Sequence, residues 1–366
     1  MKKIILFFLV VCSSISVLIL ISCTKKDNHT SRVTTQGLVG LSMLLNQNSA
    51  RGLAGYLDGV NYAHSIGINL FGMSAEWTGL ETSPYRFYLQ DNILNPLTLP
   101  DPDNTKLKSY ILVLKMIDTN RKIVPADIAS KSFDDTVLIN RFLALIDAIA
   151  ALSPVQKISH ILIGNEVDAY LGSHTSELNS FKNFYQQAVD HIHQKMPWMK
   201  VGTIITFNSL ITNPAIFDNL VLSSDFACYT YYPTDESNAH WQMRPPADVR
   251  SDFDLMSQKA GTKPFAFTEI GYPSSTENNS SELLQKQFVE NMFADLQQYK
   301  DDGKLAFIFY HGLYDYPPQF CEEYAQQQGV EPGYLCGFMN SLGLKNYVSG
   351  KAKLALDAFI QKMKTW

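Results

Sequence analysis

The sequence lacks the short motifs that mark several common enzyme classes. It contains no Gly-x-Gly-x-x-Gly and no Gly-x-x-x-x-Gly-Lys-Ser/Thr segment, so nothing indicates a dinucleotide or nucleotide-phosphate site. It also contains no His-Glu-x-x-His and no Gly-x-Ser-x-Gly, which leaves zinc-peptidase and α/β-hydrolase chemistry without support. His191 and His193 lie two residues apart in a helical pattern and would point to different faces, so we expect no metal site and no cofactor.

An excess of basic residues is also missing. Lys and Arg number 30 against 35 Asp and Glu, which gives a formal net charge of −5 at pH 7. Nucleic-acid binding needs a clustered basic surface, so we expect no nucleic-acid partner. No linker-like stretch divides the chain after position 36, and a hydrophobic content of 46% provides for one sizeable core.

The N-terminus has the pattern of an export signal. Two lysines follow Met1, and an apolar run then extends from Ile4 to Ile21. The run ends in Leu-Ile-Ser before Cys23, which resembles the bacterial lipobox, in which the cysteine becomes the lipidated first residue of the mature protein. The alternative is a single transmembrane helix, because the run approaches the roughly 20 apolar residues that span a bilayer.

These features divide the chain into three parts. Residues 1–22 are expected to be the signal peptide, and residues 23–36 a polar tether too poor in apolar side chains to fold. Residues 37–366 form the expected folded domain. We expect this domain to be a monomer in the bacterial cell envelope, outside the cytoplasm, with a lipid on Cys23 as its contact with the membrane.

Cysteine is scarce, with five residues in the chain. Cys12 belongs to the export signal and Cys23 to the lipobox. Cys321 and Cys336 lie in one polar loop, and outside the cytoplasm they can close a disulfide across about 15 residues. Cys228 lies in an apolar run and is expected to be a buried thiol.

Short apolar runs alternate with amphipathic stretches of helical period, which is the pattern of repeated βα units around a parallel sheet. Eight strands are predicted, over Leu38–Leu44, Ile68–Met73, Tyr110–Ile117, Ile158–Gly164, Val201–Phe207, Phe226–Tyr232, Pro264–Thr268 and Leu305–Tyr310. Helices are predicted over Ala50–Ser65, Thr136–Leu152, Glu177–Met196, Pro214–Val221, Pro246–Ala260, Ser281–Tyr299 and Lys351–Met363. The helix after the second strand is poorly marked.

Eight such units favour an α/β fold of the closed (β/α)₈ type, a TIM barrel in one domain. Ser281 before an apolar-periodic run, and Gly261 and Gly303 before the next strands, supply helix caps at the expected ends. The alternative is an open doubly wound sheet, which usually carries a Gly-rich phosphate loop after its first strand. That loop is missing here.

Two carboxylates lie at the carboxyl ends of predicted strands, which is where barrel enzymes carry their catalytic residues. The fourth apolar run ends in Asn165-Glu166, and the seventh ends in Glu269. A carboxylate at such a position is costly to bury unless it is paired, hydrogen-bonded or used. Two of them on one rim are what glycoside hydrolysis requires, because one must protonate the leaving oxygen while the other attacks or activates water.

With these residues the sequence resembles clan A of the glycoside hydrolases, the barrel families with Asn-Glu after strand four and a second Glu after strand seven. The segments IGNEVDAYL and FTEIGYPSS look most like the endo-β-galactanase and endo-β-glucanase branches. The resemblance covers nearly the whole folded domain. It implies that Glu166 is the acid/base, that Glu269 is the nucleophile of a retaining mechanism, and that Asn165 contacts the sugar 2-hydroxyl.

The same resemblance suggests further sugar contacts. Members often place a tyrosine of strand six against the nucleophile, and we favour Tyr231 here, with a packing role as the alternative. Glu76 and Trp77 after strand two match a segment that meets sugars, although a core role for Trp77 is equally open. Asp118, after strand three, either touches substrate or caps a turn.

One departure concerns the end of strand eight. Members commonly carry a tryptophan there as the floor of a sugar subsite, whereas this sequence reads Tyr310-His311, either of which can substitute. The loop Pro317–Cys336 that follows is a candidate wall for the cleft. Two functions therefore stand side by side: a retaining β-glycosidase acting on a carbohydrate, and a glycan-binding lipoprotein that kept the barrel without turnover.

Overall fold

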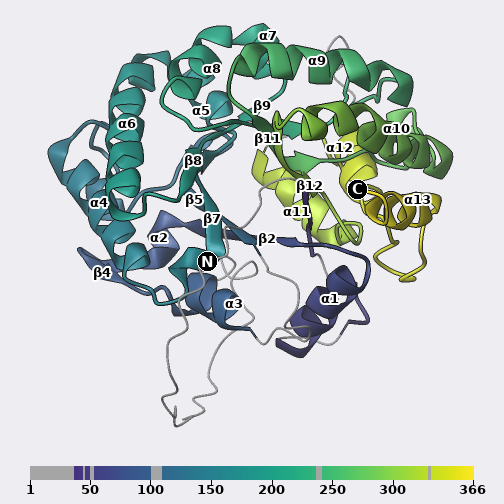
Figure 1. Cartoon of the computed structure of the whole chain (residues 1–366), viewed down its shortest axis with the longest axis horizontal. Helices are drawn as coiled ribbons and strands as arrows, with labels where there is room; N and C mark the ends of the chain where they lie inside the picture. Colours follow the sequence, from purple (N-terminus) through teal and green to yellow (C-terminus); the bar gives the residue numbers. More distant parts are fainter. Residues whose placement is uncertain (1–36, 44–45, 50–52, 100–108, 236–240, 329–330) are drawn as a thin grey trace.

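The predicted strands form one sheet that curls into a barrel (Figure 1). The computed structural model describes residues 37–366 except 44–45, 50–52, 100–108, 236–240 and 329–330. The sheet follows the order β8-β7-β5-β2-β1-β12-β11-β10-β9 with every neighbouring pair parallel. Its strands are β1 (Leu38–Leu41), β2 (Leu70–Glu76), β5 (Ser109–Asp118), β7 (Ile158–Asn165), β8 (Lys200–Gly202), β9 (Ile204–Thr206), β10 (Ala227–Tyr231), β11 (Phe265–Ile270) and β12 (Leu305–Tyr310).

The fifth predicted strand is split in two, and this split completes the ring. β8 pairs with β7 and β9 pairs with β10, so the two halves join the ends of the sheet. Between them Thr203 donates its hydroxyl to the carbonyl oxygen of Ile163 at 2.7 Å, which replaces a ladder bond. Asp168 holds β9 by accepting hydrogen bonds from the backbone nitrogen and hydroxyl of Thr206, at 2.9 and 2.6 Å. The prediction of a (β/α)₈ barrel in one domain is confirmed.

A ring of helices surrounds the sheet (Figure 1). The predicted helices are present as α1 (Leu53–Ser65), α4 (Thr136–Ala150), α6 (Leu178–Lys195), α8 (Pro214–Val221), α9 (Val249–Ala260), α10 (Glu282–Asp301) and α13 (Leu354–Met363). Shorter helices lie in the loops: α5 (Val167–Ser173), α7 (Ser209–Thr212), α11 (Pro318–Gln328) and α12 (Pro332–Met339). After β2 the described chain forms the four-residue turns α2 (Trp77–Leu80) and α3 (Asn95–Thr98), with a small hairpin of β3 (Glu81–Ser83) and β4 (Arg86–Phe87). This accounts for the weak helical signal there.

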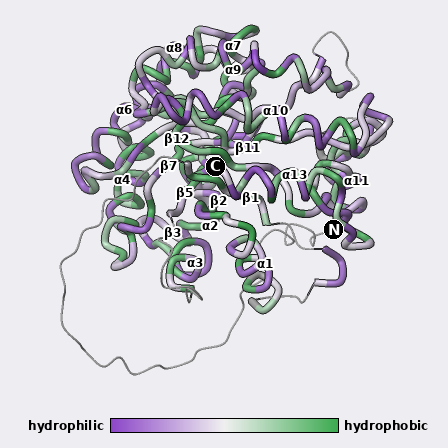
Figure 2. The backbone as a smooth tube through the Cα atoms, turned by 45° about the vertical axis from the view of Figure 1, so that its right-hand side comes forward, coloured by the Kyte–Doolittle hydropathy of each residue, from purple (hydrophilic) through white to green (hydrophobic). Residues whose placement is uncertain are grey.

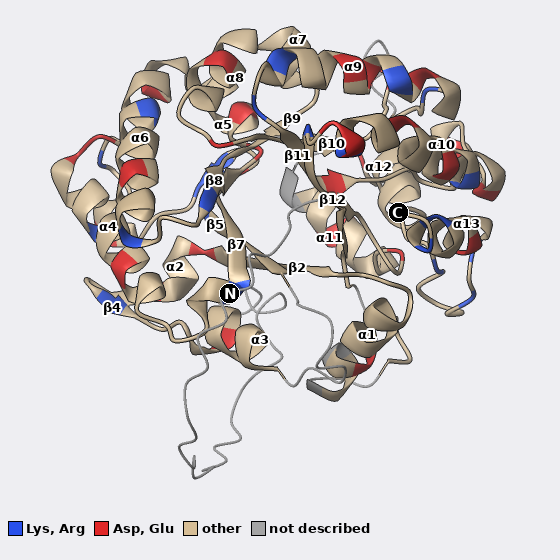
Figure 3. Ribbon diagram, viewed as in Figure 1, with Lys and Arg blue, Asp and Glu red and all other residues tan. Residues whose placement is uncertain are grey.

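The helix ends follow the sequence signals. The Ser281 hydroxyl accepts a hydrogen bond from the backbone nitrogen of Leu284 and so caps α10. Gly261 and Gly303, which follow α9 and α10, both adopt φ +67°, a conformation that glycine reaches without steric cost. Figure 3 shows Lys and Arg spread around the helix ring among Asp and Glu.

Alternating side chains of the strands fill two separate layers. One set lies inside the barrel and the other packs under the helices. Figure 2 colours the backbone by hydropathy and shows hydrophobic residues along the central strands. Phe309 lies in the barrel interior, where its ring covers β1 and β2 at Gly40 and Gly72. A Cβ atom at Gly40 would lie 2.1 Å from that ring, so glycine is required there. Within the described part of the chain, no helix is long and apolar enough to cross a membrane.

Candidate active site

Glu166 and Glu269 lie near each other at one end of the barrel. Glu166 follows the last residue of β7, and Glu269 lies in β11 opposite Thr230 of β10. The Thr230 hydroxyl donates to Oε1 of Glu166 at 2.8 Å, so a single residue connects the two glutamates. The sequence prediction that these carboxylates share one rim agrees with this arrangement.

The surroundings of Glu166 favour a protonated carboxyl group. Burial, and after it the negative charge of Glu269, raises the pKa of Glu166 to about 8. Hydroxyls of Thr119 and Thr230 donate to its two oxygens at 3.0 and 2.8 Å and oppose part of that rise. Its backbone adopts φ 45° and ψ 48°, a left-handed conformation that is uncommon for a residue with a side chain and often marks functional sites.

Glu269 has partners of a different kind. The Tyr232 hydroxyl donates to its Oε2 at 2.7 Å, and Nδ1 of His311 lies 3.8 Å from the same oxygen. His311 is bonded in turn through Nε2 to the hydroxyl of Tyr316 at 2.6 Å. Because 28% of the Glu269 side chain is exposed, the carboxylate is open to a bound molecule.

The tyrosine beside the nucleophile candidate is Tyr232, and the prediction of Tyr231 is wrong. Tyr231 is buried in the layer under the helices and donates its hydroxyl to Oδ2 of Asp252 at 2.6 Å. Tyr232 lies two residues beyond Thr230 and so points to the same side as that threonine, toward the rim. The alternation of side chains between the two faces of a strand, counted from Thr230, identifies Tyr232 from the sequence.

Asn165 joins the site through Asp118. Its Nδ2 donates to Oδ1 of Asp118 at 2.9 Å, which places the end of β5 beside the end of β7. Asp118 also lies 3.2 Å from Nζ of Lys115 and 3.6 Å from the guanidinium of Arg121. Lys115 and Arg121 thus place two positive charges beside Asp118, at the same end of the barrel as Asn165.

Trp77 is a core residue, so the prediction that it stacks on a sugar is wrong. Its ring is 1% exposed and packs against Phe142 of α4. Its Nε1 donates to Oε2 of Glu81 at 2.8 Å, and Oε1 of Glu81 accepts from Nε of Arg141 at 2.9 Å. Glu76, the preceding residue, is exposed, and its Oε1 lies 3.9 Å from the Arg121 guanidinium.

Of the two residues proposed to replace the tryptophan of strand eight, His311 alone reaches the site. Tyr310 is fully buried and packs against Phe359 of α13, so it faces the helices. The reason is alternation, because the preceding Phe309 occupies the barrel interior. The prediction of Tyr310 as a sugar contact is therefore wrong.

The cysteines of the folded domain are placed as expected. Cys321 of α11 and Cys336 of α12 form a disulfide, and Cys228 is a free, buried thiol. Cys23 and the residues assigned to signal and tether lie outside the described residues. His191 and His193 face Asp147 and Asp225 respectively, and no group of three or more potential metal ligands occurs in the described residues.

Comparison with known proteins identifies the fold. No family model and no curated protein matches the sequence. A GH5_18 from Streptomyces cattleya in complex with GlcNAc matches with 12% identity and a TM-score of 0.65, over 90% of this chain and 80% of that one. The Ignisphaera aggregans GH53 catalytic domain matches with 15% identity and a TM-score of 0.58, over 89% and 96%. A GH5_18 from Bifidobacterium longum subsp. infantis matches with 11% identity and a TM-score of 0.62, over 85% and 74%.

The chain has the barrel fold of these glycoside hydrolases. In that fold the carboxyl ends of the strands carry the site, and this is where Glu166 and Glu269 lie. Three residues at the site were missed from the sequence: Thr119, Tyr232 and Tyr316. Thr119 directly follows Asp118 and has a left-handed backbone at φ 53°. Its position, where a strand ends and a turn begins, is the sequence feature that could have identified it as a site residue.

Proposed function

We propose that this protein is a retaining β-glycoside hydrolase with Glu166 as acid/base and Glu269 as nucleophile. The observation that carries the proposal is the contrast between the two carboxyl groups. Glu166 has a raised pKa and is suited to hold a proton, whereas Glu269 accepts a hydrogen bond from Tyr232 and faces His311. Two carboxyl groups in such different environments support the assignment of Glu166 as the acid and Glu269 as the nucleophile.

The steps follow from these roles. In the first step Glu166 donates its proton to the glycosidic oxygen, and a Glu269 oxygen attacks the anomeric carbon to form a glycosyl ester as the C–O bond breaks. The Tyr232 hydroxyl keeps the attacking carboxylate in place. In the second step Glu166, now a carboxylate, takes a proton from water, which attacks the anomeric carbon and releases Glu269.

The substrate proposed is a β-linked oligosaccharide or polysaccharide. The structural neighbours include a protein described as an exo-β-1,4-mannosidase and others described as β-glucuronidases, which supports a β-glycoside without choosing the sugar. A screen against β-galactan, β-glucan, β-mannan and xylan, with reducing ends counted, tests turnover. Binding of one of these without new reducing ends would favour the alternative of a glycan-binding protein.

The assignment of the two glutamates is tested by chemical rescue. Glu269→Ala should lose nearly all turnover, and azide should restore cleavage with a product of inverted configuration. Glu166→Ala should keep its first step on substrates with good leaving groups, and azide should then give a product of retained configuration. Wild-type release of the inverted anomer, or a carboxyl separation well above the roughly 5–5.5 Å of retaining enzymes, would contradict the proposed nucleophile.

We also propose that the protein is anchored in the bacterial envelope through a lipid on Cys23. The support is the apolar run that ends before this cysteine. Cys23→Ser should leave the barrel folded and release it from membranes. Full membrane association of that variant would instead indicate a transmembrane anchor.

A further inference from the structure

Trp241 is a large, exposed aromatic residue at the end of the barrel that carries the two glutamates. It lies between β10 and α9, in a loop that follows the carboxyl end of a strand, and it is 42% exposed. Its backbone adopts φ 52°, a left-handed conformation that it shares with Thr119 and Glu166. Because that conformation costs free energy and an exposed ring recovers little of it by burial, folding stability does not explain a tryptophan here.

Two ring contacts connect Trp241 to the nucleophile. Its ring packs on Phe338 of α12 with centroids 5.4 Å apart. Phe338 packs edge-on against Tyr232, at 5.1 Å and 82°, and the Tyr232 hydroxyl donates to Oε2 of Glu269 at 2.7 Å. Trp241 is therefore the exposed end of a row of three rings whose inner end contacts Glu269.

The backbone of Trp241 is fixed to the neighbouring loop after β11. Asn278 in that loop is fully buried, and its Nδ2 donates to the carbonyl oxygens of Trp241 at 3.0 Å and of Tyr334 at 2.9 Å. Its own carbonyl oxygen accepts from the backbone nitrogen of Met243 at 2.9 Å. Tyr334, on α12, is also 42% exposed. Because both carbonyl oxygens contact one nitrogen atom, the backbones that carry these two exposed rings are adjacent.

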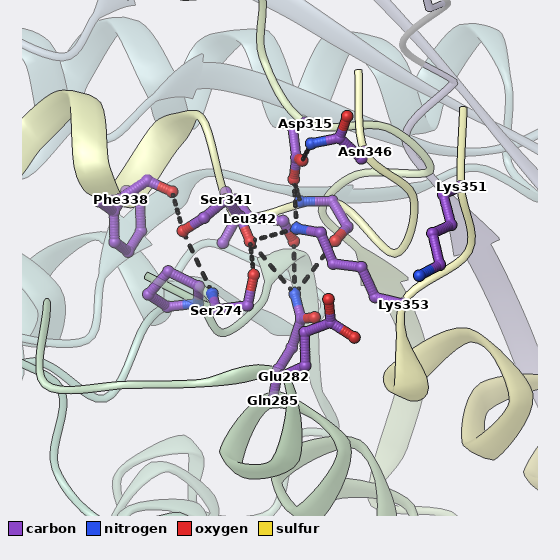
Figure 4. A network of polar contacts seen from close by, with 12 residues as sticks. Ser274, Glu282, Gln285, Asp315, Phe338, Ser341, Leu342, Asn346, Lys351 and Lys353 are labelled. Carbon is purple, nitrogen blue, oxygen red and sulfur yellow. Dashed lines mark hydrogen bonds and ion pairs between the residues drawn. The ribbon is translucent and has the colours of Figure 1, made fainter. Parts of the chain in front are cut away.

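Phe338, on which Trp241 rests, is held in a similar way. The hydroxyl of Ser341, just beyond α12, donates to the carbonyl oxygens of Gly337 at 2.7 Å and of Phe338 at 3.4 Å. It accepts in turn from the backbone nitrogen of Ser274, after β11, at 3.2 Å, and Figure 4 shows Ser341 between Phe338 and Ser274. The support of Trp241 thus combines the loops after β10, β11 and β12, all at the carboxyl end of the barrel.

We propose that Trp241 is a stacking platform for a sugar of an extended substrate, at a distance from the bond that is cleaved. This inference rests on the proposed function and makes the substrate an oligosaccharide or polysaccharide rather than a single glycoside. The C–H groups of a pyranose face pack on a flat aromatic ring, and tryptophan offers a large one. Because Phe338 and Tyr232 lie between Trp241 and Glu269, the sugar on Trp241 is not the one that Glu269 attacks.

The test compares substrates of different length. Wild type, Trp241→Leu and Trp241→Phe are assayed on β-galactan, β-glucan, β-mannan and xylan, and on the oligosaccharides of each from the disaccharide to the hexasaccharide. Leucine and phenylalanine both cover Phe338, but only phenylalanine presents a flat ring to a sugar. The matched control is Trp198→Leu, at a site 49% exposed between α6 and β8, at the opposite end of the barrel.

Trp241→Leu should lower kcat/KM about tenfold or more on the polysaccharide and by less than about twofold on the shortest oligosaccharide that wild type cleaves. Trp241→Phe should keep a larger part of the polysaccharide activity, and Trp198→Leu should change neither rate. An equal loss at every length, no loss at any length, or equal losses in the two Trp241 variants would overturn the proposal. If wild type cleaves the polysaccharide alone, the comparison of leucine with phenylalanine decides in the same way.

Failure of the proposed function has a separate signature, which is wild-type protein that cleaves none of these substrates. Electrophoresis through gels containing the same four polysaccharides then decides the matter. Retardation of wild type that is lost in Trp241→Leu and kept in Trp241→Phe supports the platform as a binding site. Any other pattern, including equal retardation of all three proteins or retardation of none, overturns it.

Discussion

Tyr232 donates its hydroxyl to Oε2 of Glu269 at 2.7 Å, while the adjacent Tyr231 turns away and bonds Asp252 at 2.6 Å. Two neighbouring tyrosines thus serve different parts of the molecule. One fixes a carboxylate at the cleft, and the other satisfies a buried carboxylate that also pairs with Arg244. The pair allows catalysis and folding to be tested separately.

Tyr232→Phe should lower kcat about 10- to 100-fold with little change in melting temperature, because it removes a donor to the attacking carboxylate and leaves the ring in place. Tyr231→Phe should instead reduce the free energy of unfolding by about 1–3 kcal/mol, because Oδ2 of the buried Asp252 carboxylate loses one of its two hydrogen bonds and keeps the one from Arg244. Steady-state kinetics and thermal melts of both variants check this. A larger kcat loss in Tyr231→Phe would contradict the assignment.

The pH dependence of turnover should show a falling limb set by Glu166. Its pKa is raised to about 8, so below that pH the group is protonated and can act as the acid, and above it the proton is lost. kcat/KM on an unactivated oligosaccharide should therefore decrease as pH rises through about 8. With a dinitrophenyl glycoside, which needs no proton to leave, this limb should flatten; a limb of equal depth on both substrates would assign it to another group.

Stability should depend on pH through the same residue. The pKa of Glu166 in the folded protein is above its ordinary value of 4.5, so its contribution to stability is complete below about pH 4.5 and is lost as pH rises through about 8. Glu166→Gln does not ionise and avoids that loss. Its melting temperature should exceed that of wild type by at least about 2 °C near pH 8, with a smaller difference near pH 5. The exposed Glu76→Gln is the control, and a constant difference across this range would contradict the raised pKa.

The buried carboxylate of Glu81 should matter for folding. It accepts hydrogen bonds from Nε1 of Trp77, Nε of Arg141 and the backbone nitrogen of Tyr85, and its side chain is fully buried. Glu81→Ala leaves the Arg141 charge without this partner and should cost about 3–5 kcal/mol of unfolding free energy. Glu76→Ala, at an exposed site, should change it by less than about 0.5 kcal/mol. Denaturant titration of the two variants makes the comparison.

The strands and the two glutamates could be predicted because each leaves a local signature. Eight apolar runs of strand length mark the barrel, and a glutamate directly after or within the end of such a run is visible without a structure. The fifth strand was predicted as one piece because Val201 to Phe207 is an uncharged run rich in β-branched residues. Its break depends on the hydrogen bond from Thr203 to Ile163, 40 residues away in the sequence.

Side-chain direction at the rim was harder to predict. Alternation along β10 places Tyr229 and Tyr231 under the helices and Thr230 and Tyr232 on the side of the glutamates, so the choice of Tyr231 came from not counting this alternation through to the end of the run. Trp77 directly follows the second strand and was therefore expected at the rim. Its burial depends on Glu81, which accepts hydrogen bonds from the Trp77 indole and from Arg141, 60 residues from Glu81 in the sequence. The disulfide between Cys321 and Cys336 was predicted from the sequence, whereas the stacking of the Tyr316 and Phe320 rings beside His311 was not, because it depends on how the loop folds back onto the end of β12.

The disulfide between Cys321 and Cys336 should be present in protein produced outside the cytoplasm. Thiol counting on the denatured, unreduced domain of residues 37–366 should then find one free thiol, that of Cys228; three would contradict the bond. Replacing both loop cysteines by serine removes a cross-link over 15 residues and should lower the free energy of unfolding by about 3 kcal/mol. Denaturant titration of this variant and of wild type makes the comparison, and an unchanged free energy of unfolding would mean that the bond adds nothing to stability.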